Sequence, residues 1–133
     1  MKLLFADTSF YAAGLMPRDA FHARAIEISK SNRCTILTTE FVIIELLNFF
    51  SRPPGRSIVA EFVRSLRNDP DTIVVPVSSE LIERGFHLFS HRPDKEWSLT
   101  DCISFVVMEE RGIAEALTTD GHFEQAGFTK LLA

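Results

Sequence analysis

Cysteine is scarce in this sequence, and its scarcity excludes two kinds of protein. Among 133 residues there are two cysteines, Cys34 and Cys102, which stand too far apart for a C-x-x-C redox motif. Two cysteines are also too few for the disulfide framework that small secreted domains use. We therefore interpret Cys102 as a buried, unreactive thiol.

Long hydrophobic runs are also missing. Glu45 and Asn48 interrupt the longest apolar stretch before it reaches the roughly 18 residues that a membrane span requires. The apolar start of the chain ends at Asp7, which is too early for the core of a secretory signal. We therefore expect a cytoplasmic protein without membrane contact, built as a single domain over residues 1–133.

The sequence motifs of several common enzyme classes do not occur. There is no G-x-x-x-x-G-K-[ST], G-x-G-x-x-G or G-x-S-x-G, so nucleotide hydrolysis, dinucleotide binding and elbow-serine hydrolysis have no support. His87 and His91 are four residues apart, but the segment between them lacks the glutamate of H-E-x-x-H. We interpret both as surface histidines without a role rather than as zinc ligands.

Positive charge is not in excess either. The net charge of −4 argues against nonspecific coating of nucleic acids, but acids that bind a cation would contribute to this number. Tyrosine and tryptophan occur once each against twelve phenylalanines, which predicts a dry core rather than a polar aromatic surface. Composition alone therefore leaves the function open.

Strand and helix patterns alternate along the chain. Short apolar or β-branched runs predict strands at Lys2–Ala6, Thr35–Leu37, Thr72–Val77, Ala114–Thr118 and Phe128–Leu132. Helical spacing, with Gly and Pro stops, predicts helices over residues 9–15, 19–31, 39–51, 57–67, 80–90 and 98–112. Ser79 is the expected cap of the helix that begins at residue 80. The alternation predicts an α/β fold with a mainly parallel sheet of four or five strands between helices.

Four acidic residues lie where α/β folds place functional groups. Asp7 and Asp120 each lie just past a predicted strand, and ligands of parallel sheets bind at the carboxyl ends of the strands. Glu45 belongs to a helix that is apolar almost all round and that we expect to be largely buried. Its carboxylate must then be paired, neutral or bound to a cation. Asp101 lies in the first turn of another helix.

Each acid also has a purely structural interpretation. Asp7 is suited to cap the helix that follows it, and Asp120 belongs to an Asp-Gly turn. Asp101 fits a capping box with Ser98, and Glu45 can belong to a narrow exposed stripe. Taken together, four carboxylates favour a Mg²⁺ site, because this hard cation prefers oxygen ligands and activates water against a phosphodiester. At least one acid of such a like-charged cluster is expected to have a raised pKa.

Several blocks of sequence resemble a PIN domain, over essentially the whole chain. They are L-F-A-D-T-S (4–9), E-L-L (45–47), T-D-C-I-S-F (100–105), A-L-T-T-D-G-H-F (116–123) and G-F (127–128). The resemblance implies a three-layer α/β/α nuclease that binds Mg²⁺ or Mn²⁺. The family's acidic positions fall on Asp7, Glu45, Asp101 and Asp120. We expect Asp7 and Asp120 to be the core metal ligands. The hydroxyl positions that help to arrange the metal site fall on Thr8 or Ser9 and on Thr118.

The resemblance also implies partners and a biological role. Many small PIN domains are VapC-type toxins, which implies an RNA substrate, a homodimer and a cognate antitoxin protein. The leading hypothesis is a Mg²⁺- or Mn²⁺-dependent endoribonuclease that acts as the toxin of a type II toxin–antitoxin pair. Two alternatives stay open: a stand-alone PIN nuclease in RNA processing, and a non-catalytic α/β interaction module. A solvated charged face explains each exposed arginine of the chain, but five of them can also contact phosphate: Arg18, Arg24, Arg52, Arg56 and Arg64.

Overall fold

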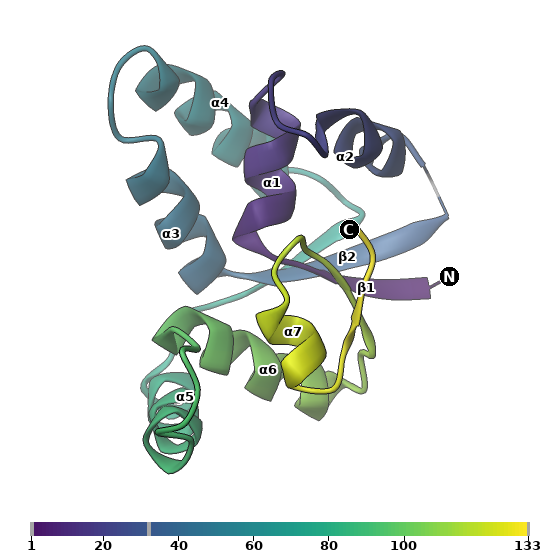
Figure 1. The fold of residues 1–133 in the computed structure, drawn as a ribbon. Coiled ribbons are helices and arrows are strands. Elements are labelled where there is room, and N and C mark those ends of the chain that lie inside the picture. Colours follow the sequence, from purple (N-terminus) through teal and green to yellow (C-terminus); the bar gives the residue numbers. More distant parts are fainter. Residues whose placement is uncertain (1, 32, 133) are drawn as a thin grey trace.

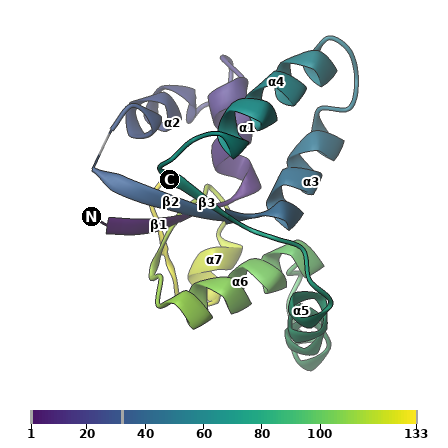
Figure 2. The same ribbon diagram turned by 180° about the vertical axis from the view of Figure 1, so that it is seen from behind.

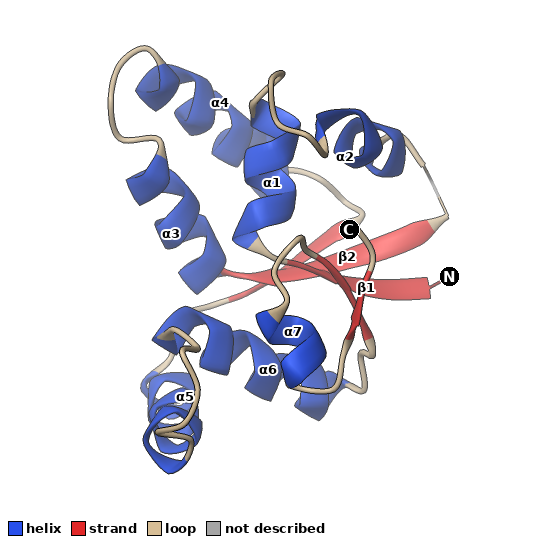
Figure 3. Ribbon diagram, in the orientation of Figure 1, coloured by secondary structure: helices blue, strands red, loops and turns tan. Residues whose placement is uncertain are grey.

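The protein folds in three layers, with a parallel sheet between two layers of helices (Figure 1 and Figure 3). The structure is a computed structural model and describes residues 2–31 and 33–132. Within these residues the sheet has five strands in the order β3-β2-β1-β4-β5, and every neighbouring pair is parallel. The strands are β1 (Lys2–Ala6), β2 (Cys34–Thr39), β3 (Thr72–Val75), β4 (Glu115–Leu117) and β5 (Thr129–Lys130). The predicted α/β fold with four or five strands is confirmed.

Two groups of helices cover the two faces of the sheet. Figure 1 and Figure 2 show α1 to α4 on one side of it and α5 to α7 on the other. The first group is α1 (Thr8–Leu15), α2 (His22–Ser29), α3 (Glu40–Phe49) and α4 (Gly55–Arg67). The second group is α5 (Ser79–His91), α6 (Leu99–Arg111) and α7 (His122–Gln125). In the part of the chain that the structure describes, no helix is long and apolar enough to cross a membrane.

The centre of the sheet determines where the acids lie. β1 pairs with β2 and β4, and its Phe5 is fully buried. The Phe5 ring packs against Phe123 of α7, which in turn meets Phe105 of α6 edge-on. This burial on both faces explains the continuous apolar run of β1. Because β1 and β4 are parallel neighbours, the loops that carry Asp7 and Asp120 open at the same edge of the sheet.

Local hydrogen bonds explain where helix boundaries differ from the predictions. α2 begins at His22 rather than Asp19, because the Asp19 carboxylate accepts the N–H two residues on and holds a turn. The cap of α5 is Ser78 rather than Ser79, since the Ser78 hydroxyl accepts the Leu81 N–H. The remaining boundaries that differ do so by one or two residues. The sequence does not predict α7, because a helix of four residues has no periodic pattern.

α3 is less buried than its apolar sequence predicts. Its inner side, with Val42 and Leu46, is fully buried, but Ile44 and Phe49 are 49% and 63% exposed. The expectation of a largely buried helix is therefore wrong. Phe86 on α5 is 59% exposed as well, so the phenylalanines do not all belong to a dry core. α3 and α5 cover opposite faces of the sheet, but Figure 1 and Figure 2 show both at the edge of the molecule where β2 runs into α3.

Candidate active site

A cleft at the carboxyl ends of β1 and β4 brings the predicted acids together. It has a volume of about 510 Å³ and lies between α1, α3 and the starts of α6 and α7. Six acidic side chains line it: Asp7, Asp19, Glu45, Glu96, Asp101 and Asp120. No arginine or lysine among the described residues lines the cleft, so negative charge dominates it. A concave site rich in carboxylate oxygens is suited to hold a divalent cation.

Asp7 is the most deeply buried of these acids, with 5% of its surface exposed. It stands at the N-cap of α1 but makes no side-chain cap bond. Instead its carboxylate accepts hydrogen bonds from the hydroxyls of Ser9 (3.1 Å) and Thr118 (2.9 Å). Burial raises the pKa of Asp7 to about 6; the charge of Asp101 adds to the rise, and the hydrogen bonds oppose it. A raised pKa was expected from like charge, but burial is its main cause.

The same two hydroxyls join the loops that follow β1 and β4. Ser9 Oγ accepts the Thr119 N–H at 3.1 Å, and Thr118 Oγ1 accepts the Asp120 N–H at 3.0 Å. Each hydroxyl thus donates to Asp7 and accepts from the loop after β4. This network fixes the two loops relative to each other.

Glu45 reaches the cleft from α3. Its Oε1 accepts a 2.6 Å hydrogen bond from the hydroxyl of Thr8, at the start of α1. Phe49, one turn further along α3, lines the same cleft. Glu45 is half-buried and has a side-chain partner, so an exposed stripe on α3 does not account for it.

Asp101 caps its helix and also lines the cleft. Its carboxylate accepts the Ser98 N–H (3.1 Å) and the Ser98 hydroxyl accepts the Asp101 N–H (3.0 Å), so the predicted capping box is present. The same carboxylate oxygen lies 3.2 Å from Nδ1 of His122 inside the cleft. The start of α6 therefore holds Asp101 in a fixed position at the site.

Asp120 and His122 complete the most compact group of ligand atoms. Asp120 Oδ1 accepts the His122 N–H at 2.9 Å, as the turn interpretation predicts, and Asp120 Oδ2 lies 3.4 Å from His122 Nδ1. Ligand atoms of Asp101, Asp120 and His122 all lie within 4.8 Å of one another. Across residues 2–31 and 33–132, no other three or more His, Cys, Asp or Glu side chains meet that condition. Asp7 and Glu45 line the cleft outside this group.

His122, which lines the cleft, was not predicted from the sequence as a site residue. It stands in the block A-L-T-T-D-G-H-F, two positions after Asp120, but its four-residue helix gives no periodic signal. The Asp-Gly turn after a buried strand is the signal that could have found it, because that turn keeps the next residues near the strand ends. Asp19 and Glu96 also line the cleft; they lie outside helices and strands, where no pattern marks them.

The other residues that were set aside lie elsewhere. His87 and His91 are exposed on α5 and line a different pocket, with their ring centroids 3.9 Å apart. Cys102 is fully buried, and burial together with the charge of Asp101 raises the pKa of its thiol. A raised pKa keeps the thiol protonated, as expected for an unreactive cysteine.

Comparison with known proteins identifies the family. The sequence profile of the PIN domain matches residues 4–129. The chain belongs to the PIN-domain family. This PIN domain is also similar to the 23S rRNA-specific endonuclease VapC20 of Mycobacterium tuberculosis strains CDC 1551 / Oshkosh and ATCC 25618 / H37Rv. The identity is 32% over 130 residues, which cover 97% of this chain and 98% of that protein.

A solved structure agrees with this assignment. The crystal structure of Mycobacterium tuberculosis VapC20, described as a Sarcin-Ricin loop cleaving toxin, matches with a TM-score of 0.87 at 30% identity. The match covers 98% of this chain and 99% of that one. The predicted resemblance to VapC-type PIN domains and the predicted three-layer fold are therefore confirmed.

Proposed function

We propose that this PIN domain is a metal-dependent endoribonuclease that acts in the cytoplasm as the toxin of a type II toxin–antitoxin pair. The observation that carries the proposal is the meeting of all four family acids in one cleft. It is supported by similarity over nearly the whole chain to an rRNA endonuclease. No acid of the family pattern is replaced, which disfavours a non-catalytic interaction module.

The donor set suits Mg²⁺ or Mn²⁺. Both cations accept carboxylate oxygens, and a bound cation would neutralise phosphate charge and activate a water. We place Asp101 and Asp120 nearest the cation, because their oxygens already lie within 4.8 Å of each other. Asp7 and Glu45 complete the site from β1 and α3, held by their hydroxyl partners.

His122 bears on which of the two cations binds. Mg²⁺ takes oxygen ligands almost exclusively, whereas divalent transition metals also accept imidazole nitrogen. Nδ1 of His122 lies within 3.4 Å of carboxylate oxygens from both Asp101 and Asp120. We therefore propose that His122 favours Mn²⁺ over Mg²⁺ in this cleft.

The substrate and the antitoxin follow from the same cleft. The relatives are named for cutting 23S rRNA and for cleaving the Sarcin-Ricin loop, so an RNA hairpin with that loop is the first substrate to test. The concentrated negative charge of the cleft is suited to receive an arginine from the antitoxin. A guanidinium pairs with a carboxylate through two parallel hydrogen bonds.

We propose that α3 and α5 form the interface of a homodimer. Ile44 and Phe49 are exposed on α3, and α5 exposes Ile82, Phe86 and Phe89. The three residues of α5 are spaced by four and three positions, so they share one face of the helix. Exposed apolar side chains gathered on one side of a molecule are typical of an interaction surface.

Cleavage of an end-labelled RNA hairpin by the purified chain tests the nuclease function. We expect cleavage with Mg²⁺ or Mn²⁺ and none in excess chelator, because the cation activates the water. Asp120→Asn is expected to lower the rate by about 100-fold or more, since groups that merely support metal ligands already contribute about 10- to 100-fold. The matched control is Asp71→Asn, because Asp71 is exposed just before β3, at the opposite edge of the sheet. Full activity in excess chelator would refute the metal dependence.

Expression in a bacterial host distinguishes a toxin from a stand-alone RNA-processing nuclease. We expect growth arrest that Asp7→Asn abolishes, and we expect a small antitoxin gene beside this one whose co-expression relieves the arrest. If the wild-type protein cuts RNA but neither arrests growth nor binds the product of that gene, the toxin assignment fails and the nuclease assignment stands.

A further inference from the structure

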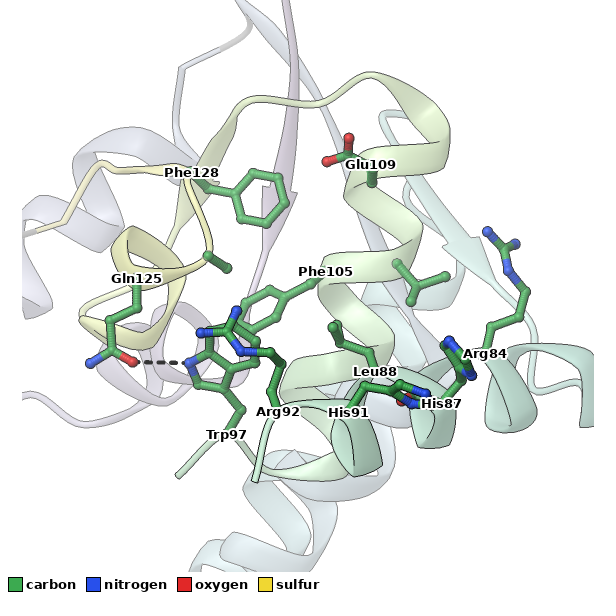
Figure 4. A pocket seen from close by; sticks show the side chains of 12 residues that line it. Arg84, His87, Leu88, His91, Arg92, Trp97, Phe105, Glu109, Gln125 and Phe128 are labelled. Carbon is green, nitrogen blue, oxygen red and sulfur yellow. Dashed lines mark hydrogen bonds between the residues drawn. The ribbon is translucent and has the colours of Figure 1, made fainter. Parts of the chain in front are cut away.

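A second pocket lies beside the active-site cleft, between α5, α6 and the segment from α7 to β5 (Figure 4). It has a volume of about 610 Å³, within the range of about 300–1,000 Å³ that is typical of ligand sites. Its floor is apolar and includes Leu88, Phe105, Val106, Ala126 and Phe128. None of the predicted acids lines it, so it is separate from the cleft.

One wall of this pocket is basic. Arg84, His87 and His91 are spaced by three and four residues, so they share a face of α5, and Figure 4 shows them in a row along the helix. Arg92 continues the row and lies over the ring of Trp97, with 5.2 Å between its guanidinium carbon and the ring centroid. The pairs that Arg84 makes with Glu110 and Arg92 makes with Asp94 are exposed. Exposed pairs contribute little, so these cations are free to exchange their partners for phosphate.

The pocket and the cleft share a wall. Trp97 directly precedes Ser98, which lines the cleft and holds Asp101. Its Nε1 donates a 3.0 Å hydrogen bond to Gln125, shown as the dashed line in Figure 4. α7 begins with His122 in the cleft and ends with Gln125 in the pocket, about 4.5 Å further along the helix.

The positive charge of its wall indicates what the pocket binds. RNA binding depends on cations that neutralise phosphates, and no arginine or lysine among the described residues lines the cleft itself. The basic wall of the neighbouring pocket can supply them. The carboxylate of Glu109, on α6 (Figure 4), lies away from that wall and can accept a hydrogen bond from an amino group of a base.

We propose that this pocket binds a nucleotide of the RNA substrate adjacent to the phosphodiester that is cut. The two phosphates that flank this nucleotide lie against Arg84 and Arg92, one against each, and its base lies on the apolar floor beside Phe128. A basic groove with an aromatic floor is the combination that binds unpaired nucleotides. This inference rests on the proposed function. It places His87 and His91, to which we assigned no role from the sequence, in the wall of the pocket that faces the RNA.

The salt dependence of RNA binding tests the pocket. The probe is an RNA hairpin with the sarcin–ricin loop, bound to the Asp120→Asn variant so that it is not cut. Adding Arg84→Gln and Arg92→Gln removes both charges and keeps most of each side chain. We expect the Kd to rise at least 10-fold at about 0.1 M salt, and the slope of log Kd against log salt to fall by about 1.5, because each phosphate contact contributes about 0.7 to 0.9.

The matched control removes two charges elsewhere. Lys30 and Arg33 are exposed between α2 and β2, at the end of the sheet opposite the cleft. Lys30→Gln with Arg33→Gln changes the net charge by the same amount, so we expect it to leave the slope nearly unchanged. Equal effects of the two double variants would overturn the pocket, since net charge alone would then explain the loss.

A crosslinking measurement does not depend on any substitution. Hairpins with 4-thiouridine next to the cleavage site are expected to crosslink to peptides that contain Phe128 or His87. Crosslinks confined to other parts of the protein would overturn the proposal. So would pocket variants that lose antitoxin binding and keep RNA binding, because the pocket would then be a protein-docking site. A wild-type protein that cuts no RNA would instead refute the proposed function.

Discussion

The carboxylate of Asp7 is buried, accepts two hydroxyl hydrogen bonds and has a pKa raised from 3.8 to about 6. For a carboxylate, a raised pKa in the folded state means that ionisation opposes folding. The penalty is absent below about pH 4, grows between pH 4 and 6, and is complete at neutral pH. A bound cation reverses this balance, because it interacts with the ionised form.

We predict that Asp7→Asn stabilises the metal-free protein at pH 7.5 by up to about 3 kcal/mol, the equivalent of the pKa shift. The amide oxygen can still accept from Ser9 and Thr118, so both hydroxyls keep their acceptor. At about pH 4 the two proteins are expected to have nearly equal stability. Urea unfolding with chelator at both pH values measures the difference. A variant less stable than wild type at pH 7.5 would contradict this account of Asp7.

The selectivity between Mn²⁺ and Mg²⁺ tests whether His122 is a metal ligand. We predict that His122→Asn lowers the affinity for Mn²⁺ by about 10-fold or more and changes that for Mg²⁺ much less. Electron paramagnetic resonance of Mn²⁺, with Mg²⁺ as competitor, measures both affinities without any cleavage. His91→Asn is the control, because His91 is exposed on α5 outside the cleft. Equal losses for both cations would remove His122 from the ligands.

The acids could be predicted from the sequence because each stands beside a recognisable boundary. Asp7 follows an apolar strand, and Asp101 follows a serine cap by three residues. The individual distances could not be predicted. The burial of Asp7 depends on Thr118, 111 positions away, and no local pattern contains that contact.

Among the helices, α6 couples its own stability to the site, because its capping box includes Asp101. We predict that Ser98→Ala destabilises the metal-free protein by about 1 kcal/mol and also weakens Mn²⁺ binding, since Asp101 loses a hydrogen bond that positions it. Ser78→Ala is the control, because Ser78 caps α5 in the same way and lies outside the cleft. Thermal melts with chelator and titration calorimetry with Mn²⁺ separate the two effects. If both variants bind Mn²⁺ like wild type, the capping box has a structural role only.

Helices long enough to show a period were predicted well, as α4 and α6 demonstrate. The position of α3 was also predicted, but its burial was not. A pattern gives the apolar residues of a helix and not the surface that covers them, so Ile44 and Phe49 could not be identified as exposed.

For the whole molecule, the exposed side chains of α3 and α5 predict a dimer in solution. We expect Phe86→Asp to convert it to a monomer, because a carboxylate at a buried apolar interface loses its hydration. Ile58→Asp is the control: Ile58 is 56% exposed, close to the 59% of Phe86, but lies on α4. Sedimentation equilibrium measures the mass of each protein. A Phe86→Asp variant that stays dimeric would place the interface elsewhere.

The hydrogen bonds that join residues 7–9 to residues 118–120 have a consequence for the synthesis of the protein. A ribosome releases the amino-terminal part first, so β1 and Asp7 emerge long before β4 can pair with them. A nascent chain that stops short of residue 118 lacks Asp120 and the hydroxyl that holds Asp7, and it has no complete cleft. The cleft is therefore completed only after almost the whole chain has left the ribosome.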